Sequence, residues 1–372
     1  MWIRTSSIGR SRLTDPSSPH GQLTPAPDPR EEAWIRELPD AVQGSVLAFA
    51  DPNPPGARAR AQLAAQALIE LVAGWGPAAA GLSEALDDLV RHLHSVGQTT
   101  LHQPGVGNML EAVLADEFRE DRGGANANPA VIAARMRQRY ASATATMTEA
   151  SETMAREGSA LLRDGDTILV HDFADRSTQA VVRRAAVDAK HLTVVATACR
   201  SRRTDGLRVA RESIHVGHEA IVVTDAGVGW AVSTMDLRLC LIGADAILPD
   251  GTILTSPGAL TIALVGQRRG IPVYAVTDLW KIMAGLSPEL LALNEVEDPD
   301  GVPEALDWAA AGYGYRNPLV DVVPGDTLRG LITEAGIIEP SMAGTEARRR
   351  YGIGPAASGA GGPGRAGTKG AG

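Results

Sequence analysis

Residues 165–185 read "GDTILVHDFADRSTQAVVRRA", and this stretch decides the fold. The run "TILV" at 167–170 is short, apolar and rich in strand-forming residues, whereas residues 177–189 are helix-like. An apolar strand followed at once by a helix predicts a βα unit, from which parallel sheets are built. Gly165 therefore marks the point at which the chain changes from one kind of structure to another.

The alternation of strands and helices continues downstream. Strands are expected at 192–197, 220–224, 239–242 and 273–276, with helices at 206–215 and 259–269. Such alternation implies right-handed crossovers and a mostly parallel sheet that is covered on both faces. The sequence therefore predicts an α/β protein in which residues 165–341 form a Rossmann-like ligand-binding domain.

Upstream of Gly165 the apolar residues recur at helical spacing, so residues 29–164 are expected to form a helical domain. Ser83 is expected to cap one of its helices, and a longer helix is expected from about 129 to 163. Residues 1–28 are rich in Ser and Pro, and residues 342–372 end in a Gly/Ala/Pro tail. Both segments are expected to be disordered.

The composition of the chain and the motifs that it lacks exclude several classes of function. The chain has 372 residues with a net charge of −9 and a pI near 5.4, which argues against a nucleic-acid backbone as its partner. No secretory leader or membrane-spanning run is visible, so a cytoplasmic location without membrane contact is expected. Cys199 and Cys240 lack metal-ligand spacing and are expected to be buried, reduced thiols. The chain has no P-loop, GxGxxG or GxSxG motif, so neither a cofactor nor a metal is expected.

Ligands of doubly wound sheets bind beyond the carboxyl ends of the strands, and this rule selects candidate site residues without an alignment. The selected residues follow the five expected strands in turn: His171, Asp172, Asp175 and Arg176; Cys199, Arg202 and Arg203; Asp225; Gly243 and Asp245; Asp278 and Lys281. Acidic and guanidinium groups thus concentrate at one edge of the predicted sheet.

Two of these loops have the residues of an anion site. The stretch "RSRRTDG" at 200–206 places arginines between a strand and a helix, where a phosphate can bind; the alternative is a solvated charged loop. In "TSPG" at 255–258, Ser256 can cap a helix that has Pro257 at its first position. Free N–H groups there, with Gly258, would also receive a phosphate, although ordinary capping explains the residue types equally well.

Asp245 is the strongest single candidate for a functional residue. A carboxylate directly after an apolar strand is costly unless it is partnered or used, so Asp245 can serve as a general acid or base or hold a sugar hydroxyl. The alternative is a turn-stabilising role, as expected for Asp250. His171 either hydrogen-bonds a ligand or is a satisfied structural histidine. The pair His215 and His218 is expected to lie exposed on a helix rather than to bind metal.

Two longer stretches carry a family resemblance. "GADAILPDGTILTSPGALTIALVG" at 243–266 and "NPLVDVVPGDTLRGLITEAGIIEPS" at 317–341 resemble the alpha, beta and delta regulatory subunits of translation initiation factor two-B. The same superfamily contains methylthioribose-1-phosphate isomerase and ribose-1,5-bisphosphate isomerase. The likeness covers about 165–341. It implies a sugar-phosphate or nucleotide pocket at the sheet edge and a homodimer or larger homo-oligomer.

The sequence departs from this family at residues that matter for chemistry. The isomerases carry a catalytic cysteine directly after the histidine of the first strand end, and Asp172 stands there in this chain. Their catalytic aspartate in the "GAD" motif is retained as Asp245. Thr255 and Ser256 replace the usual Asn and Lys, and Lys281 matches a family lysine. Arg202 can supply a guanidinium group from a shifted position.

Two functions remain open from the sequence. The first is a non-catalytic sensor or assembly subunit that binds a phosphorylated sugar or nucleotide, favoured by Asp172 in the cysteine position. The second is an aldose–ketose isomerase acting on a ribose phosphate, in which Asp245, with Asp172, moves a proton between sugar carbons. The expected ligand contacts in either case are His171, Arg176, Arg202, Arg203, Asp225, Gly243, Ser256, Gly258 and Lys281.

Overall fold

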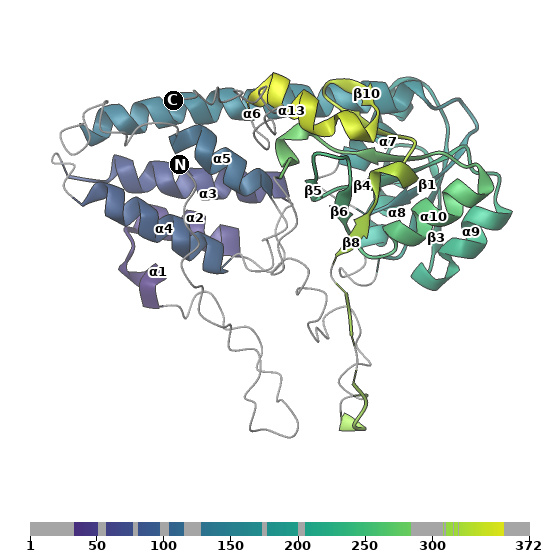
Figure 1. The fold of residues 1–372 in the computed structure, drawn as a ribbon, viewed down its shortest axis with the longest axis horizontal. Helices are drawn as coiled ribbons and strands as arrows, with labels where there is room; N and C mark the ends of the chain where they lie inside the picture. The colour runs from purple at the N-terminus through teal and green to yellow at the C-terminus, as the bar shows by residue number, and fades with distance from the viewer. Residues whose placement is uncertain are drawn as a thin grey trace, which may run out of the picture.

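The computed structural model describes residues 33–50, 57–76, 81–96, 104–114, 128–172, 177–199, 205–283, 308, 310–314, 316–318 and 320–352. Within these ranges a bundle of helices is followed by an α/β domain, as Figure 1 shows. The expected disordered segment 1–28 lies outside the described residues. None of the described helices combines the length and the apolar character needed to cross a membrane.

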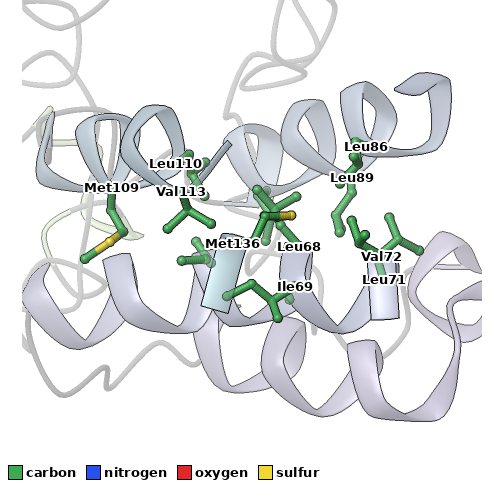
Figure 2. Close-up of a cluster of buried hydrophobic side chains, with 14 of the residues drawn as sticks. Leu68, Ile69, Leu71, Val72, Leu86, Leu89, Met109, Leu110, Val113 and Met136 are labelled. Atoms are coloured by element: carbon green, nitrogen blue, oxygen red, sulfur yellow. The ribbon is translucent and has the colours of Figure 1, made fainter. Parts of the chain in front are cut away.

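Helices alone make up the first part of the described chain. They are α1 (Ala33–Glu37), α2 (Asp40–Ala50), α3 (Ala57–Ala73), α4 (Leu82–Val96), α5 (Pro104–Leu114) and α6 (Pro129–Ala160). Their core contains Leu68, Leu89, Met109 and Met136, drawn in Figure 2. Because α3 carries many alanines on its buried side, neighbouring helices can approach it closely.

The N-terminus of α6 has a side-chain cap, whereas the cap expected for α4 is not formed. Asn128 caps α6, since its side chain accepts a hydrogen bond from the Ala130 N–H, and Pro129 occupies the first helical position. The expectation that Ser83 caps a helix is wrong, because α4 begins one residue earlier, at Leu82. The Ala85 N–H bonds instead to the Gly81 carbonyl oxygen.

The main sheet has seven strands in the order β10-β9-β7-β4-β1-β2-β3. The strands are β1 (Thr167–His171), β2 (Thr193–Thr197), β3 (Glu219–Val223), β4 (Leu239–Gly243), β7 (Val273–Val276), β9 (Gly330–Thr333) and β10 (Gly336–Ile338). All neighbouring pairs are parallel except β9–β10. The five strands expected from the sequence are therefore adjacent members of one mostly parallel sheet.

Alternate residues of β1 enter two different cores, as a sheet buried on both faces requires. Ile168 and Val170 pack in one cluster, and Leu169 packs in the other. The described helices between the strands are α7 (Ser177–Val187), α8 (Asp205–His215), α9 (Val228–Thr234) and α10 (Ala259–Arg269). The described connections also contain short 3-10 turns: η7 (Asp225–Gly227), η8 (Leu279–Lys281), η10 (Gly325–Thr327) and η11 (Pro340–Met342).

A small antiparallel sheet, which the sequence did not suggest, lies beyond the end of β4. It consists of β5 (Ala246–Ile247), β6 (Ile253–Thr255) and β8 (Asp321–Val323) in that order. Two or three residues are too few to show a period of two, so the sequence carries no strand signal at these positions. Its registers place Thr255 opposite Asp321.

The prediction of a disordered tail from residue 342 is wrong for its first part. Helix α13 covers Ala343–Tyr351, and Figure 1 shows it beside the main sheet. Ala343 and Ala347 are buried in the core of the α/β domain. The Tyr351 hydroxyl donates to the Glu334 carboxylate at 2.7 Å. Tertiary contacts thus fix a segment whose composition is polar. Residues 353–372 lie outside the described ranges.

Candidate functional site

The strand order places β1 at the point where the winding of the sheet reverses. From β1 the chain proceeds to β2 and β3 on one side, and then returns to β4 and β7 on the other. Crevices for ligands form at such a switch point, beyond the carboxyl ends of the strands. The residues at these ends are His171, Thr197, Gly243 and Val276, for β1, β2, β4 and β7 respectively. We use the name β1/β4 crevice for this edge of the sheet, which these strand ends define and where the switch-point rule expects a ligand.

His171 is hydrogen-bonded both to the end of β2 and to the loop after β6. It is fully buried, with Nδ1 lying 2.6 Å from the Thr197 hydroxyl and Nε2 lying 3.2 Å from the Ser256 carbonyl oxygen. Because that carbonyl can only accept, Nε2 carries a proton and donates to it. In the neutral ring the Thr197 hydroxyl then donates to Nδ1. Both ring nitrogens are therefore engaged inside the protein, which favours the structural alternative for this histidine.

Asp172 follows His171 in an uncommon backbone conformation. Its φ is +73°, in the left-handed region that few non-glycine residues adopt, and its side chain is buried. The Thr255 hydroxyl donates to its carboxylate at 3.4 Å, and the Thr178 hydroxyl donates to its main-chain oxygen at 3.3 Å. Residues held in this conformation cluster at functional sites, where the surrounding structure stabilises them.

Asp245 and Lys281 lie on the other side of the crevice. Asp245 is 4% exposed and comes two residues after β4, the neighbour of β1. The Lys281 ammonium donates to the carbonyl oxygen of Ala244 at 2.8 Å, and its side chain is also buried. Gly243 ends β4, is buried, and lies opposite Val276 of β7 in the sheet. The two predicted catalytic carboxylates, Asp172 and Asp245, therefore follow adjacent strands.

The expected anion site at the start of α10 is already filled by the protein. Helix α10 begins at Ala259 rather than Pro257, with Gly258 at its N-cap position and a φ of +111°. The Asp321 carboxylate accepts hydrogen bonds from the N–H groups of Gly258 and Leu260, at 2.8 and 2.9 Å. The prediction that Ser256 caps this helix is therefore wrong, and these two N–H groups are not free to receive a phosphate.

Gly258 is required for close packing against His171. A Cβ at this position would lie 2.9 Å from the imidazole Cε1 atom, and the positive φ adds to the need for glycine. The expected ligand contact of Gly258 stays a prediction; in the described structure this residue packs against the His171 ring.

Asp225 supports the end of the next strand. Its carboxylate accepts a hydrogen bond from the Cys199 N–H at 2.7 Å, and Cys199 has a φ of +52°. The side chain thus stabilises a left-handed residue two positions after the end of β2. The predicted ligand contacts Arg176, Arg202 and Arg203 lie outside the described residues, as does Asp175.

Sequence reasoning missed an acidic cluster behind the crevice. The Glu334 carboxylate accepts hydrogen bonds from the Leu279 N–H and the Tyr351 hydroxyl. Burial, followed by repulsion from Asp278, raises the pKa of Glu334 above its ordinary value. Asp278 also lies 3.7 Å from the guanidinium group of Arg58, which comes from helix α3. These residues are far apart in the sequence, and no local pattern connects them.

No group of three or more metal-ligating residues gathers in the described parts of the chain. The expectation that His218 is exposed is wrong: it is buried, accepts from the Leu192 N–H and donates to the Val182 carbonyl oxygen. Burial raises the pKa of the Cys240 thiol to about 12.

With this geometry established, a family model gives the decisive comparison. Residues 54–340 match the model of the initiation factor 2 subunit family. The chain belongs to this family. The match includes the bundle from helix α3 onward and the sheet as far as β10.

Within the initiation factor 2 subunit family the relatives are of two kinds. A protein of Pyrococcus horikoshii, provisionally named translation initiation factor eIF-2B subunit 2-like, is 31% identical over 194 residues, covering 52% of this chain and 65% of that protein. Ribose 1,5-bisphosphate isomerase of Methanocaldococcus jannaschii is 27% identical over 198 residues, covering 52% and 62%. These matches span less than two thirds of either relative.

The fold agrees with a solved member of the family. The crystal structure of the Pyrococcus horikoshii OT3 translation initiation factor eIF-2B superposes with a TM-score of 0.63 at 25% identity, over 82% of this chain and 98% of that chain. The family therefore joins this chain both to initiation-factor-like proteins and to sugar-phosphate isomerases.

Proposed function

We propose that this chain is a non-catalytic member of the initiation factor 2 subunit family that binds a phosphorylated sugar or nucleotide in the β1/β4 crevice, as a sensor or assembly subunit. One observation carries the proposal. Asp172 occupies the position after His171 at which the resemblance places the catalytic cysteine of the isomerases, and its carboxylate is buried and bonded to Thr255. A carboxylate lacks the nucleophilicity of a thiolate and cannot directly replace it.

The two described thiols do not substitute for the missing cysteine. Cys240 lies inside β4, and its raised pKa of about 12 keeps it protonated near neutral pH. Cys199 is fully buried after β2, where Asp225 holds its N–H group. Reactive cysteines are partly exposed, whereas buried structural thiols are inert.

Ligand binding is supported by the concentration of buried polar groups at the switch point. Asp172, Asp245 and Lys281 are each less than 5% exposed, although charged residues are rarely buried without a role. Because Asp321 occupies the start of α10, the proposal assigns the phosphate to Lys281 and to the arginines at 176, 202 and 203.

The proposal is tested by a ligand panel. Thermal unfolding is measured with AMP, ribose 5-phosphate, ribose 1,5-bisphosphate and methylthioribose 1-phosphate. A ligand at about 100 times its Kd stabilises the folded state by about 2.7 kcal/mol, a readily measured shift in Tm. NMR of the binding compound is expected to show no conversion. Absence of a shift with every compound contradicts the proposal.

One observation favours an aldose–ketose isomerase as the alternative. Asp172 and Asp245 follow adjacent strands and are both nearly inaccessible to solvent, an arrangement in which two carboxylates can share the movement of a proton. In that case the NMR experiment shows turnover of a ribose phosphate, and Asp245→Asn abolishes it. Turnover that survives Asp245→Asn removes Asp245 from the chemistry.

We also propose that the chain forms a homodimer or larger homo-oligomer, as the resemblance implies. Light scattering coupled to size-exclusion chromatography measures the assembly mass directly. A monomer at micromolar concentration contradicts this part of the proposal.

A further inference from the structure

The first turn of helix α7 lies at the β1/β4 crevice. Ser177, Thr178 and Gln179 are its first three residues, and each is at most 2% exposed. The Thr178 hydroxyl donates to the main-chain oxygen of Asp172, so this turn is joined directly to the end of β1. The Ser256 carbonyl oxygen accepts a hydrogen bond from His171, the residue before Asp172. The His171–Asp172 segment is therefore flanked by α7 and by the loop that follows β6.

Two buried polar side chains on these flanking segments make no hydrogen bond within the described structure. They are the Gln179 amide, through both Nε2 and Oε1, and the Ser256 hydroxyl. Buried polar groups are otherwise almost always hydrogen-bonded, and an unsatisfied one lowers the stability of the fold. Nearby buried side chains follow that rule, since Thr178, Thr197 and Thr255 all have partners.

We infer that Gln179 and Ser256 recognise the hydroxyl groups of the ligand. An amide offers donors and an acceptor, and a serine hydroxyl offers one of each, which matches a sugar hydroxyl that itself donates and accepts. Neither group carries a charge to attract a phosphate. This inference rests on the proposed function and deepens it: these residues read the uncharged sugar, while cationic residues hold its phosphate.

The inference predicts opposite effects on stability and on binding. Gln179→Leu replaces an unsatisfied amide by an apolar group of similar size, so the ligand-free variant is expected to melt at or above the wild-type temperature. The Kd for ribose 5-phosphate is expected to rise about tenfold or more, because a hydrogen-bonding partner of the sugar is lost. Ser256→Ala is expected to act in the same direction. Both quantities are measured by thermal unfolding with and without ligand.

Ser213→Ala is the matched control, because Ser213 is buried but donates to the Val209 carbonyl oxygen within helix α8. It is expected to keep the wild-type response to ribose 5-phosphate. Inorganic phosphate is the second probe, and its effect is expected to be the same in wild type and in Gln179→Leu.

Each contrary outcome has a distinct meaning. A wild-type response to ribose 5-phosphate that Gln179→Leu retains overturns this inference alone. A ligand-free Gln179→Leu that melts several degrees lower also overturns it, because the amide then makes structural hydrogen bonds. If none of the sugar phosphates shifts the wild type, the proposed function fails and this inference fails with it.

Discussion

At the scale of single residues, one carboxylate decides where helix α10 begins. Asp321 pairs with Thr255 across the small sheet, and its side chain accepts from the Gly258 and Leu260 N–H groups. The negative charge also lies at the positive end of the helix dipole. Asp321 is therefore both the cap of the helix and the group that excludes an anion from it.

Asp321→Ala is expected to destabilise the protein by about 1–2 kcal/mol, because two helix N–H groups lose their acceptor. Asp321→Asn keeps an acceptor and loses only the charge, so a smaller loss is expected. Urea denaturation of the two variants measures both effects. If Asp321→Asn destabilises the protein as much as Asp321→Ala does, the charge of Asp321 contributes more to stability than its hydrogen bonds, and the interpretation is wrong.

At the scale of elements, helices α6 and α7 approach each other through a glycine. A Cβ at Gly158 would lie 2.5 and 2.9 Å from the two γ-carbons of Val181, and both helices are buried at this crossing. The contact joins α6, the longest described helix, to α7, and it leaves no room for a side chain.

Gly158→Ala is therefore expected to destabilise the protein by about 1–3 kcal/mol through overpacking. Gly44→Ala is the matched control, because Gly44 lies inside helix α2 with no atom within 4 Å of an added Cβ. It is expected to stabilise by about 0.5–1 kcal/mol, since alanine favours a helix. Urea denaturation compares the two variants, and a stabilised Gly158→Ala would contradict the close contact.

Helix α13 is hydrogen-bonded to an ionisable group, Glu334, so the contribution of this contact to the stability of the fold depends on pH. The pKa of Glu334 is raised above its ordinary value of 4.5, so its favourable contribution is complete below pH 4.5 and is lost as pH rises through the folded-state pKa. The Tyr351 hydroxyl opposes this shift by donating to the carboxylate. Asp278 strengthens the shift.

Tyr351→Phe is expected to raise the pKa of Glu334 further and to cost about 1–2 kcal/mol at pH 8, with a smaller loss at pH 4. Tyr313→Phe is the control, because Tyr313 is 68% exposed. Urea denaturation at the two pH values measures the difference. A loss that is greater at pH 4 would show that the hydroxyl does not stabilise the ionised carboxylate.

The main elements could be predicted from the sequence because each has its own pattern. Strands β1, β2, β3, β4 and β7 are short apolar runs, and the strand-end rule then selected His171, Asp172 and Asp245. The start of α10 was not predictable in this way, since its capping carboxylate lies about 60 residues further along the chain. Helix α13 was missed because its polar sequence becomes ordered only through contacts with η8 and η11 and through hydrogen bonds to Glu334.

At the scale of the whole molecule, helix α5 of the bundle is hydrogen-bonded to the segment of the α/β domain that carries Lys281. The Asn108 side chain on α5 donates to the carbonyl oxygens of Trp280 and Ile282, at 2.5 and 3.1 Å. Trp280 packs in the core of the bundle although it belongs to η8 of the α/β domain. Lys281, between these two residues, is thereby fixed from both domains.

Asn108→Ala is expected to destabilise the protein by about 1–3 kcal/mol, because two buried carbonyl oxygens lose their donor. Amide hydrogen exchange at 279–283 is expected to accelerate more than exchange in the centre of β1. Equal acceleration at both places would mean that the hydrogen bonds do not act locally. Gln43→Ala serves as a comparison, since its side chain bonds within the bundle, to the Leu38 carbonyl oxygen.

Because the indole of Trp280 packs in the core of the bundle, separating the α/β domain from the bundle is unfavourable. A chain that began at Gly165 would carry the α/β domain without the helices that cover this side chain, and its apolar surface would meet water. Such a fragment is expected to aggregate unless residue 280 is also replaced. Joining this domain to an unrelated helical partner is therefore expected to give a stable protein only if the new partner also covers the Trp280 ring.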